Sequence, residues 1–221
     1  MENQQETKFL SGLFKWLKLC FFGYIIGDLL ISTGAVLELT TGSSMYGPGL
    51  AISLGEYIGG LGGLVYLFGL LGSIIFFCIF SFRATKNLKI YDSKLMETSP
   101  GWAVGWYFIP FANLWKPFGV MEQMWEGSHD LIGDDRVRPN RIVYWWICWV
   151  LTNIVSNASF RMTLNSGGMG DYATNVELYK TALNFDIVSG AFGIVAALLI
   201  LPVLNSIARA QDSYIRASAF N

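Results

Sequence analysis

Four long stretches of the chain carry almost no charge, and this pattern limits the folds that the chain can adopt. Residues 57–82, 142–160 and 187–208 contain no Asp, Glu, Lys or Arg, and residues 19–37 contain only Asp28. A helix needs about 20 predominantly apolar residues to cross the hydrocarbon core of a bilayer. The pattern therefore predicts an all-α membrane protein with four transmembrane helices at these positions, forming a single membrane domain over residues 1–221.

Basic residues indicate how such helices would be oriented. Of the 15 Lys and Arg residues, 13 precede the first stretch, follow the fourth or lie between the second and third. Only Arg161 and Lys180 lie in the two loops expected on the other side, at about 39–56 and 161–186. Cytoplasmic loops carry the excess of basic residues in membrane proteins. We therefore expect the N- and C-termini and the central loop to be cytoplasmic.

The composition argues against several classes of protein. Charged residues make up 14% of the chain, against about 25% in soluble domains, and the net charge of −1 gives no indication of a nucleic-acid partner. The three cysteines lie in apolar stretches and His129 is the only histidine, so neither a metal site nor a disulfide framework is expected. No nucleophile–base pair or cofactor motif is visible, which favours a non-enzymatic protein without a cofactor.

The central loop contains a segment, residues 100–127, that is too aromatic for a solvated connection. Residues 99–128 hold four of the eight tryptophans, and Pro110 and Pro117 divide them. We predict short helices at about 102–109 and 117–127, because proline is tolerated in the first turn of a helix but not in its interior. An amphipathic, Trp/Pro-rich interfacial segment on the inner leaflet explains this pattern, and so does a shallow re-entrant hairpin. The predicted apolar face consists of Phe111, Leu114, Trp115, Phe118, Met121 and Trp125.

Motifs around this loop resemble a known family. They are Phe82-Arg83-Ala84, Asn87, Ser99-Pro100-Gly101-Trp102-Ala103-Val104-Gly105-Trp106, Ile109-Pro110, Asn113-Leu114-Trp115-Lys116-Pro117, Trp125 and Gln211. Over about residues 57–212 the chain resembles the bacterial multi-pass membrane family catalogued as domain of unknown function 4328. The resemblance implies a location in the bacterial cytoplasmic (inner) membrane, and it implies no activity for any residue.

Arg83 and Asn87 are candidate binding residues at the inner end of the second stretch, one helical turn apart. The Arg83 side chain could extend to lipid headgroups, pair with Glu122 or Glu126, or hold a lipid phosphate bidentately. Asn113 could bind a ligand or cap a helix that begins near Leu114 or Pro117. The remaining candidates for binding a lipid or a partner are the aromatic residues Trp102, Trp106, Trp115 and Trp125.

Asp28 is the candidate for an intramembrane polar site. A charged side chain at the centre of a membrane helix costs about 2.5–3.5 kcal/mol on insertion scales. Asp28 should therefore face the interior of the helical bundle, either as a proton or cation site or in a structural hydrogen bond to Asn153 or Asn157.

Small residues and a proline indicate how the helices pack. Gly23 and Gly27 form one GxxxG pattern, and Gly59 and Gly63 form another. Such glycines let helices approach closely within the chain or form the face of a homodimer. We expect both motifs to lie at close helix contacts, and we expect Pro202 to kink the fourth helix or to mark its end.

Three hypotheses about function follow. The first is a non-enzymatic membrane protein that binds membrane lipid or a protein partner through the Trp-rich segment. The second is a small transporter or channel component that uses Asp28, in which case four spans per chain would call for a homo-oligomer. The third is a membrane enzyme that acts on a lipid.

Overall fold

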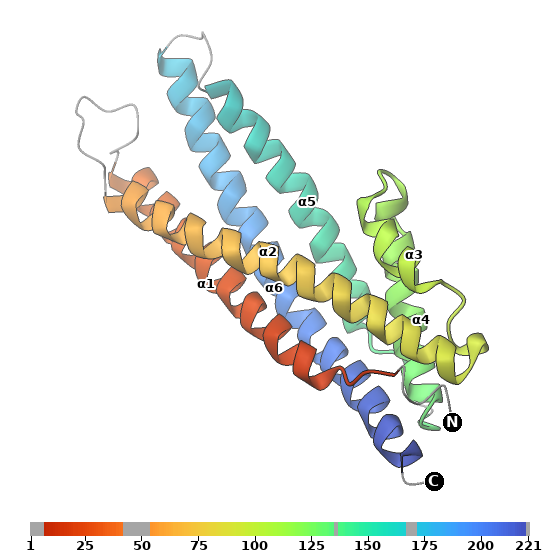
Figure 1. The fold of residues 1–221 in the computed structure, drawn as a ribbon. Coiled ribbons are helices and arrows are strands. Elements are labelled where there is room, and N and C mark those ends of the chain that lie inside the picture. Colours follow the sequence, from red (N-terminus) through yellow and green to blue (C-terminus); the bar gives the residue numbers. More distant parts are fainter. Residues whose placement is uncertain (1–6, 42–53, 135–136, 167–171, 220–221) are drawn as a thin grey trace. The chain divides into compact units, whose positions relative to one another are not determined.

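The computed structural model describes residues 7–41, 54–134, 137–166 and 172–219, and all the regular structure in these ranges is helical (Figure 1). The all-α class is therefore confirmed for the described residues. The long helices are α1 (Ser11–Thr41), α2 (Leu54–Tyr91), α5 (Arg141–Ser166) and α6 (Tyr172–Ser218). Between α2 and α5 lie η2 (Ser93–Leu95), α3 (Pro100–Gly105), η3 (Trp106–Phe108), η4 (Ala112–Leu114) and α4 (Lys116–Asp130).

Three helices in the described ranges have the length and apolar composition needed to cross a membrane. They are Ser11–Thr40, Leu54–Tyr91 and Asn175–Ser218, with mean hydropathies of 1.8, 2.4 and 2.6 in their apolar windows. They contain the spans predicted at 19–37, 57–82 and 187–208. Residues 142–160 are also helical, within the 26 residues of α5, but α5 is less apolar and is not among the three. Its role as a fourth span stays a prediction.

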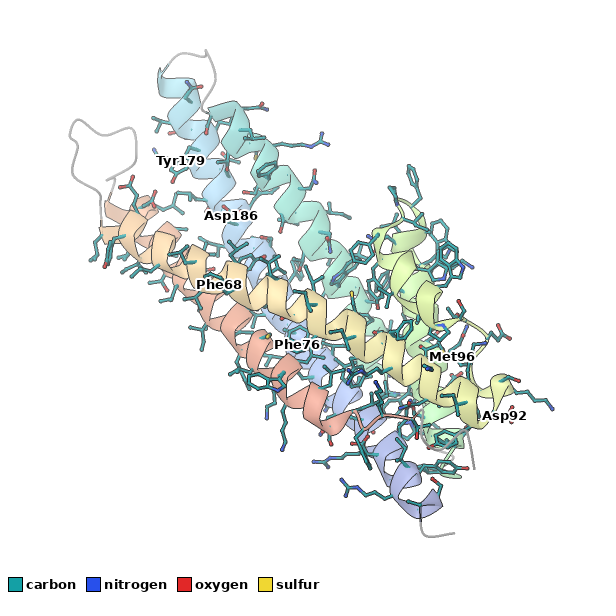
Figure 2. The ribbon with its side chains drawn as sticks, viewed as in Figure 1. Phe68, Phe76, Asp92, Met96, Tyr179 and Asp186 are labelled. Atoms are coloured by element: carbon teal, nitrogen blue, oxygen red, sulfur yellow. The ribbon has the colours of Figure 1, made fainter. Side chains whose placement is uncertain are left out.

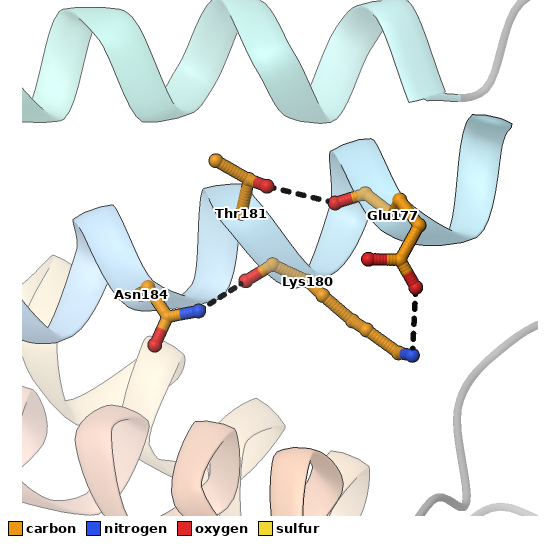
Figure 3. A network of polar contacts seen from close by, with 4 residues as sticks. All are labelled: Glu177, Lys180, Thr181 and Asn184. Atoms are coloured by element: carbon orange, nitrogen blue, oxygen red, sulfur yellow. Dashed lines mark hydrogen bonds and ion pairs between the residues drawn. The ribbon is translucent and has the colours of Figure 1, made fainter.

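Helix α6 begins well before the uncharged stretch that predicted it. Its early turns are polar, and their side chains bond along the helix itself (Figure 3). The Thr181 hydroxyl donates to the Glu177 carbonyl at 2.8 Å, the Asn184 amide donates to the Lys180 carbonyl at 2.9 Å, and the Lys180 ammonium pairs with the Glu177 carboxylate at 3.0 Å. The expected outer loop at 161–186 is therefore largely helical. Parts of both predicted outer loops, residues 42–53 and 167–171, lie outside the described residues.

Pro202 does not end helix α6, which continues to Ser218. A proline inside a helix removes one backbone hydrogen bond. The next turns are held by burial, because Val203, Leu204, Ile207 and Ala208 are all buried. Whether Pro202 kinks the fourth span or marks its cytoplasmic end stays a prediction.

The chain divides into two compact units, which we describe separately. The loop-bearing unit contains residues 1–20, 71–146 and 198–221, and the glycine-rich unit contains residues 21–70 and 147–197. Each unit takes part of α1, α2, α5 and α6, while α3 and α4 belong to the loop-bearing unit.

A buried polar network holds the loop-bearing unit together around Gln211 of α6. The Gln211 amide donates to the Ser128 hydroxyl at 2.9 Å and to the Ala84 carbonyl at 3.2 Å. Its carbonyl accepts a hydrogen bond from the Asn87 amide at 3.0 Å. Gln211, Ser128 and Asn87 are all buried. Because each of these polar groups has a partner, the network joins α2, α4 and α6 without the cost of an unsatisfied buried group.

Helix α1 begins where Asp212 of α6 meets its first amides. The two carboxylate oxygens of Asp212 accept hydrogen bonds from the backbone N–H groups of Leu10 at 2.7 Å and Ser11 at 2.9 Å. The first N–H groups of a helix have no partner within the helix, and a negative charge there is also favoured by the helix dipole. Asp212 therefore fixes the start of α1 against α6.

In the glycine-rich unit, helices α1 and α2 approach so closely that several positions admit only glycine. A Cβ atom at Gly27 would collide with the backbone of Tyr66, and one at Gly62 would lie 2.7 Å from the backbone nitrogen of Ile31. Gly34 makes a similar close approach to Gly55 and Gly59, and Gly69 to Tyr24. At Gly63, however, nothing lies within 4 Å of an added Cβ. The expectation that Gly63 lies at a close helix contact is wrong, because Gly62 occupies the interface.

The Trp-rich segment separates into an exposed part and a buried part. In α4, Met121, Met124 and Trp125 are buried within the loop-bearing unit. Before α4, five large apolar side chains are exposed, while Trp106, Tyr107 and Ile109 are half-buried. The predicted single apolar face is thus divided, because its second half supplies protein core. The exposed side chains are Trp102, Phe108, Phe111, Leu114 and Trp115.

Candidate functional site: a basic pocket beside α2

A pocket of about 480 Å³ lies in the loop-bearing unit, along the second half of α2. Lys8 lies before α1, and Gly101 and Val104 belong to α3; the other lining residues belong to α2. One part of the lining is polar and the other is apolar or small. The polar residues are Lys8, Arg83, Lys86 and Asn87, and the others are Cys78, Ile79, Phe82, Gly101 and Val104.

The spacing along α2 explains why these residues meet. Ile79, Arg83 and Lys86 are separated by four and then three residues, so they follow one face of the helix. That face is apolar at Ile79 and cationic one and two turns later. The pocket can therefore receive a ligand with a negatively charged group at one end and an apolar part at the other.

Asn87 positions the pocket wall, because both polar groups of its side chain form hydrogen bonds within the protein. Its carbonyl accepts from the Lys8 backbone N–H at 3.2 Å, and its amide donates to the Lys8 carbonyl at 3.0 Å as well as to Gln211. Asn87 is 2% exposed. The residue thus holds Lys8 against α2, which places Lys8 on the lining of the pocket.

The Arg83 guanidinium makes no hydrogen bond or ion pair with the part of the chain that the structure describes. Arg83 was expected to have Glu122 or Glu126 as a possible partner, but Glu122 pairs with Arg138. Arg83 therefore presents its planar fork of donors to the pocket. This geometry suits the oxygens of a phosphate or carboxylate.

The aromatic candidates do not lie together in one place. Trp102 and Trp106 stack with their ring centroids 4.4 Å apart, and the Lys116 ammonium lies 5.4 Å from the Trp106 ring centroid. Trp115 is 55% exposed, whereas Trp125 is buried beside His129. The exposed part of the segment is therefore available for contacts outside the chain, and Trp125 is not.

The link between the two halves of the segment has an unusual backbone. Phe111 has a φ of 64° although it is not glycine, and it is 78% exposed. A positive φ is costly for a bulky residue. Asn113 does not cap a helix as one expectation had it, because neither η4 nor α4 begins with a side-chain cap. The Asn113 side-chain oxygen is buried without a hydrogen bond.

Tyr107 attaches the segment to α2. Its ring packs edge-on against Phe77 with the centroids 5.4 Å apart. Its hydroxyl oxygen is buried, and this burial raises the pKa of Tyr107 above its ordinary value. The hydroxyl therefore stays neutral, and the ring contact with Phe77 is what attaches the segment to α2.

The structure does not bring together the three intramembrane candidates. Asp28 is buried. Asn153 is exposed and its amide donates to the Trp149 carbonyl of its own helix at 2.7 Å. Asn157 is also exposed, and its carbonyl accepts from the Arg161 guanidinium at 3.0 Å. The predicted hydrogen bond between Asp28 and either asparagine is not formed.

Sequence reasoning missed two features of the loop-bearing unit. Lys86 lies three residues after Arg83, a spacing that could have placed it on the same face, but no local pattern brings Lys8 to the end of α2. The second feature is a contact between His129 and Ser206, although no nucleophile–base pair was expected. His129 Nε2 lies 3.0 Å from the Ser206 hydroxyl, and Nδ1 lies 2.8 Å from the Trp125 carbonyl. Because His129 is 3% exposed, this pair ties α4 to α6.

Fold and pocket together define an all-helical protein, compatible with a membrane, that has a basic pocket at the end of one of its apolar helices. Residues 49–209 match the family described as "Domain of unknown function (DUF4328)", and the chain belongs to this family. The resemblance predicted from the motifs is thus confirmed. Searches of curated proteins and of solved structures found no match.

Proposed function

We propose that this protein is a non-enzymatic, multi-pass protein of the bacterial cytoplasmic membrane that binds the phosphate group of an anionic lipid in the basic pocket. In this proposal α5 is the fourth span, both termini are cytoplasmic, and the Trp-rich segment rests on the inner leaflet. The observation that carries the proposal is the pocket itself, where Lys8, Arg83 and Lys86 line one part and apolar α2 residues line the other.

The chemistry of the pocket favours a lipid over a small polar anion. A free phosphate would use only the cationic part, whereas Cys78, Ile79 and Phe82 offer an apolar wall next to it. These residues belong to the apolar stretch of α2, and Arg83 is the first charged residue after that stretch. At a membrane surface, this order places Arg83 at the depth of the lipid phosphates and the apolar residues of α2 beside the acyl chains.

The exposed half of the Trp-rich segment supports the inner-leaflet placement. Trp102, Phe111 and Trp115 are each about half exposed or more. Tryptophan is enriched where membranes meet water, because its ring is apolar and its N–H is polar. The strained backbone at the exposed Phe111 also fits a residue whose position is set by what it contacts outside the chain.

Lipid binding is tested by native mass spectrometry of the purified chain with phosphatidylglycerol, phosphatidylcholine or inorganic phosphate. We expect retention of phosphatidylglycerol and about a tenfold loss of that affinity in Arg83→Gln, since one charge-assisted bidentate contact contributes about 1.5–3 kcal/mol. Lys94→Gln is the matched control, because Lys94 is an exposed cation outside the pocket. Equal binding of both lipids, or equal losses in both variants, would contradict the proposal, and retention of inorganic phosphate alone would make the pocket a site for a soluble anion.

A further inference from the structure

The glycine-rich unit contains a second polar feature, which the lipid pocket does not use. Asp28 of α1 is 7% exposed, and its Oδ2 atom is buried without a hydrogen bond. Asp28 makes no ion pair with the described residues. A carboxyl group in this condition is rare, because buried polar atoms in folded proteins are nearly always paired.

The Asp28 side chain lies at a close contact between α1 and α6. A Cβ atom at Gly190 would collide with Asp28 Oδ2, and one at Gly193 would collide with the Tyr24 hydroxyl. The two glycines of α6 thus make room for two polar side chains of α1, one turn apart. The Asp28 side chain thus has space beside Gly190, and no donor from the described residues bonds to its Oδ2 atom.

The titratable groups around Asp28 come from three helices. Tyr24 lies on α1, Tyr66 on α2 and Asp186 on α6, and the charge of Asp186 acts on Asp28. The Tyr24 and Tyr66 rings lie 5.0 Å apart, and Figure 2 labels Asp186 on α6. None of these groups supplies a positive charge, and an ionised Asp186 would repel a carboxylate at Asp28.

We propose that Asp28 is a proton-binding site within the apolar helices and that it is the neutral acid which the fold accommodates. An ionised carboxylate buried without a donor or cation is strongly disfavoured, while the neutral acid avoids both the desolvation of charge and the repulsion by Asp186. Ionisable side chains at such positions recur in proton pathways, where a proton is taken up and released at one carboxyl group. Among the described residues no group of three or more His, Cys, Asp and Glu side chains could hold a metal ion.

A hydrophobic carbodiimide tests this proposal in the intact chain in liposomes. Dicyclohexylcarbodiimide adds to a protonated carboxyl group and rearranges to a stable N-acylurea, with no leaving group. We expect peptide mass spectrometry to find the adduct on Asp28 at acidic pH, and its rate of formation to fall about tenfold per pH unit once the acid ionises. Asp28→Asn should lose the adduct, and Asp92→Asn, which removes an exposed carboxylate, should keep it.

Infrared spectroscopy decides the question where the reagent does not reach the site. The wild-type chain should show a carboxylic acid C=O band that Asp28→Asn lacks and Asp92→Asn retains. Absence of this band in the wild type would overturn the proposal. Protection of Asp28 by sodium ions at constant pH would also overturn it, in favour of a cation site. Either result is independent of phosphatidylglycerol binding, so this inference and the proposed function can fail separately.

Discussion

The Gln211 network of the loop-bearing unit and Asp28 of the glycine-rich unit are both buried polar sites, but only the network is satisfied by its neighbours. In the loop-bearing unit, Gln211, Asn87 and Ser128 form a network in which each member has a hydrogen-bond partner. In the glycine-rich unit, Asp28 is buried to a similar degree and its Oδ2 has no partner. A satisfied network contributes to stability and needs no ligand. An unsatisfied acid costs stability, which is the reason to connect Asp28 with proton binding.

The largest expected effect comes from breaking the satisfied network. Gln211→Leu would remove one hydrogen bond each from the Asn87 amide, the Ser128 hydroxyl and the Ala84 carbonyl, while Asn87 and Ser128 keep their bonds to Lys8 and Met124. We expect a loss of about 4 kcal/mol in the free energy of unfolding, because each of the three lost hydrogen bonds contributes about 0.5–1.5 kcal/mol and the Asn87 N–H left unpaired costs about 1–3 kcal/mol more. Reversible unfolding in mixed detergent micelles measures this loss.

Asn184→Ala is the control for that measurement, because Asn184 is exposed and bonds only along its own helix. Its effect should stay within about 0.5 kcal/mol, as for most surface substitutions. If Gln211→Leu were as mild as this control, the contrast between the Gln211 network and Asp28 would have no energetic basis.

A smaller effect is expected at the helix contact of the glycine-rich unit. Gly62→Ala should lower the free energy of unfolding by about 2 kcal/mol, since overpacking at a fixed contact costs about 1–3 kcal/mol and the added Cβ would meet the backbone of Ile31. Gly63→Ala is the adjacent control, and open space at Gly63 together with the better helix propensity of alanine makes it neutral or slightly stabilising. Thermal unfolding of the two variants in the same detergent gives the comparison, and equal midpoints would count against the close contact.

The pair Gly62 and Gly63 also shows how far the sequence can be read. Uncharged stretches predict where apolar helices occur, because charge and length decide whether a helix can enter a membrane. They do not predict which face of a helix meets its neighbour, so the GxxxG spacing suggested Gly63 where the structure uses Gly62. Helix ends were also predicted too short, since polar turns such as Glu177–Asn184 continue α6 by bonding along the helix.

The candidate site was predictable in part for the same reason. The four-residue spacing of Arg83 and Asn87 predicts that they share one face of α2, and both line the pocket. Lys8 joins them only through Asn87, a contact between residues 79 positions apart. Asp28 was predicted to be an intramembrane acid, but Gly190, which meets its carboxyl group, belongs to a distant helix. Local spacing predicts residues that share a helix face, and long-range packing decides the rest.

The smallest effect on stability is expected at Trp115, where the exposed half of the Trp-rich segment can be compared with the buried half. Trp115 is 55% exposed and Trp125 is 6% exposed. Trp115→Ala should change the free energy of unfolding by less than about 1 kcal/mol, whereas Trp125→Ala should lower it by about 3–5 kcal/mol through loss of core packing.

The same pair separates membrane contact from folding. If Trp115 rests in the inner leaflet, Trp115→Ala loosens the segment from the lipid surface while the protein stays folded. Limited proteolysis of inverted membrane vesicles should then cut between α3 and α4 faster in Trp115→Ala than in the wild type. In detergent, where no leaflet holds the segment, the two chains should be cut at equal rates. Faster cleavage in both settings would mean that Trp115 holds the segment to the protein, and unchanged cleavage in vesicles would mean that its exposed ring does not meet lipid.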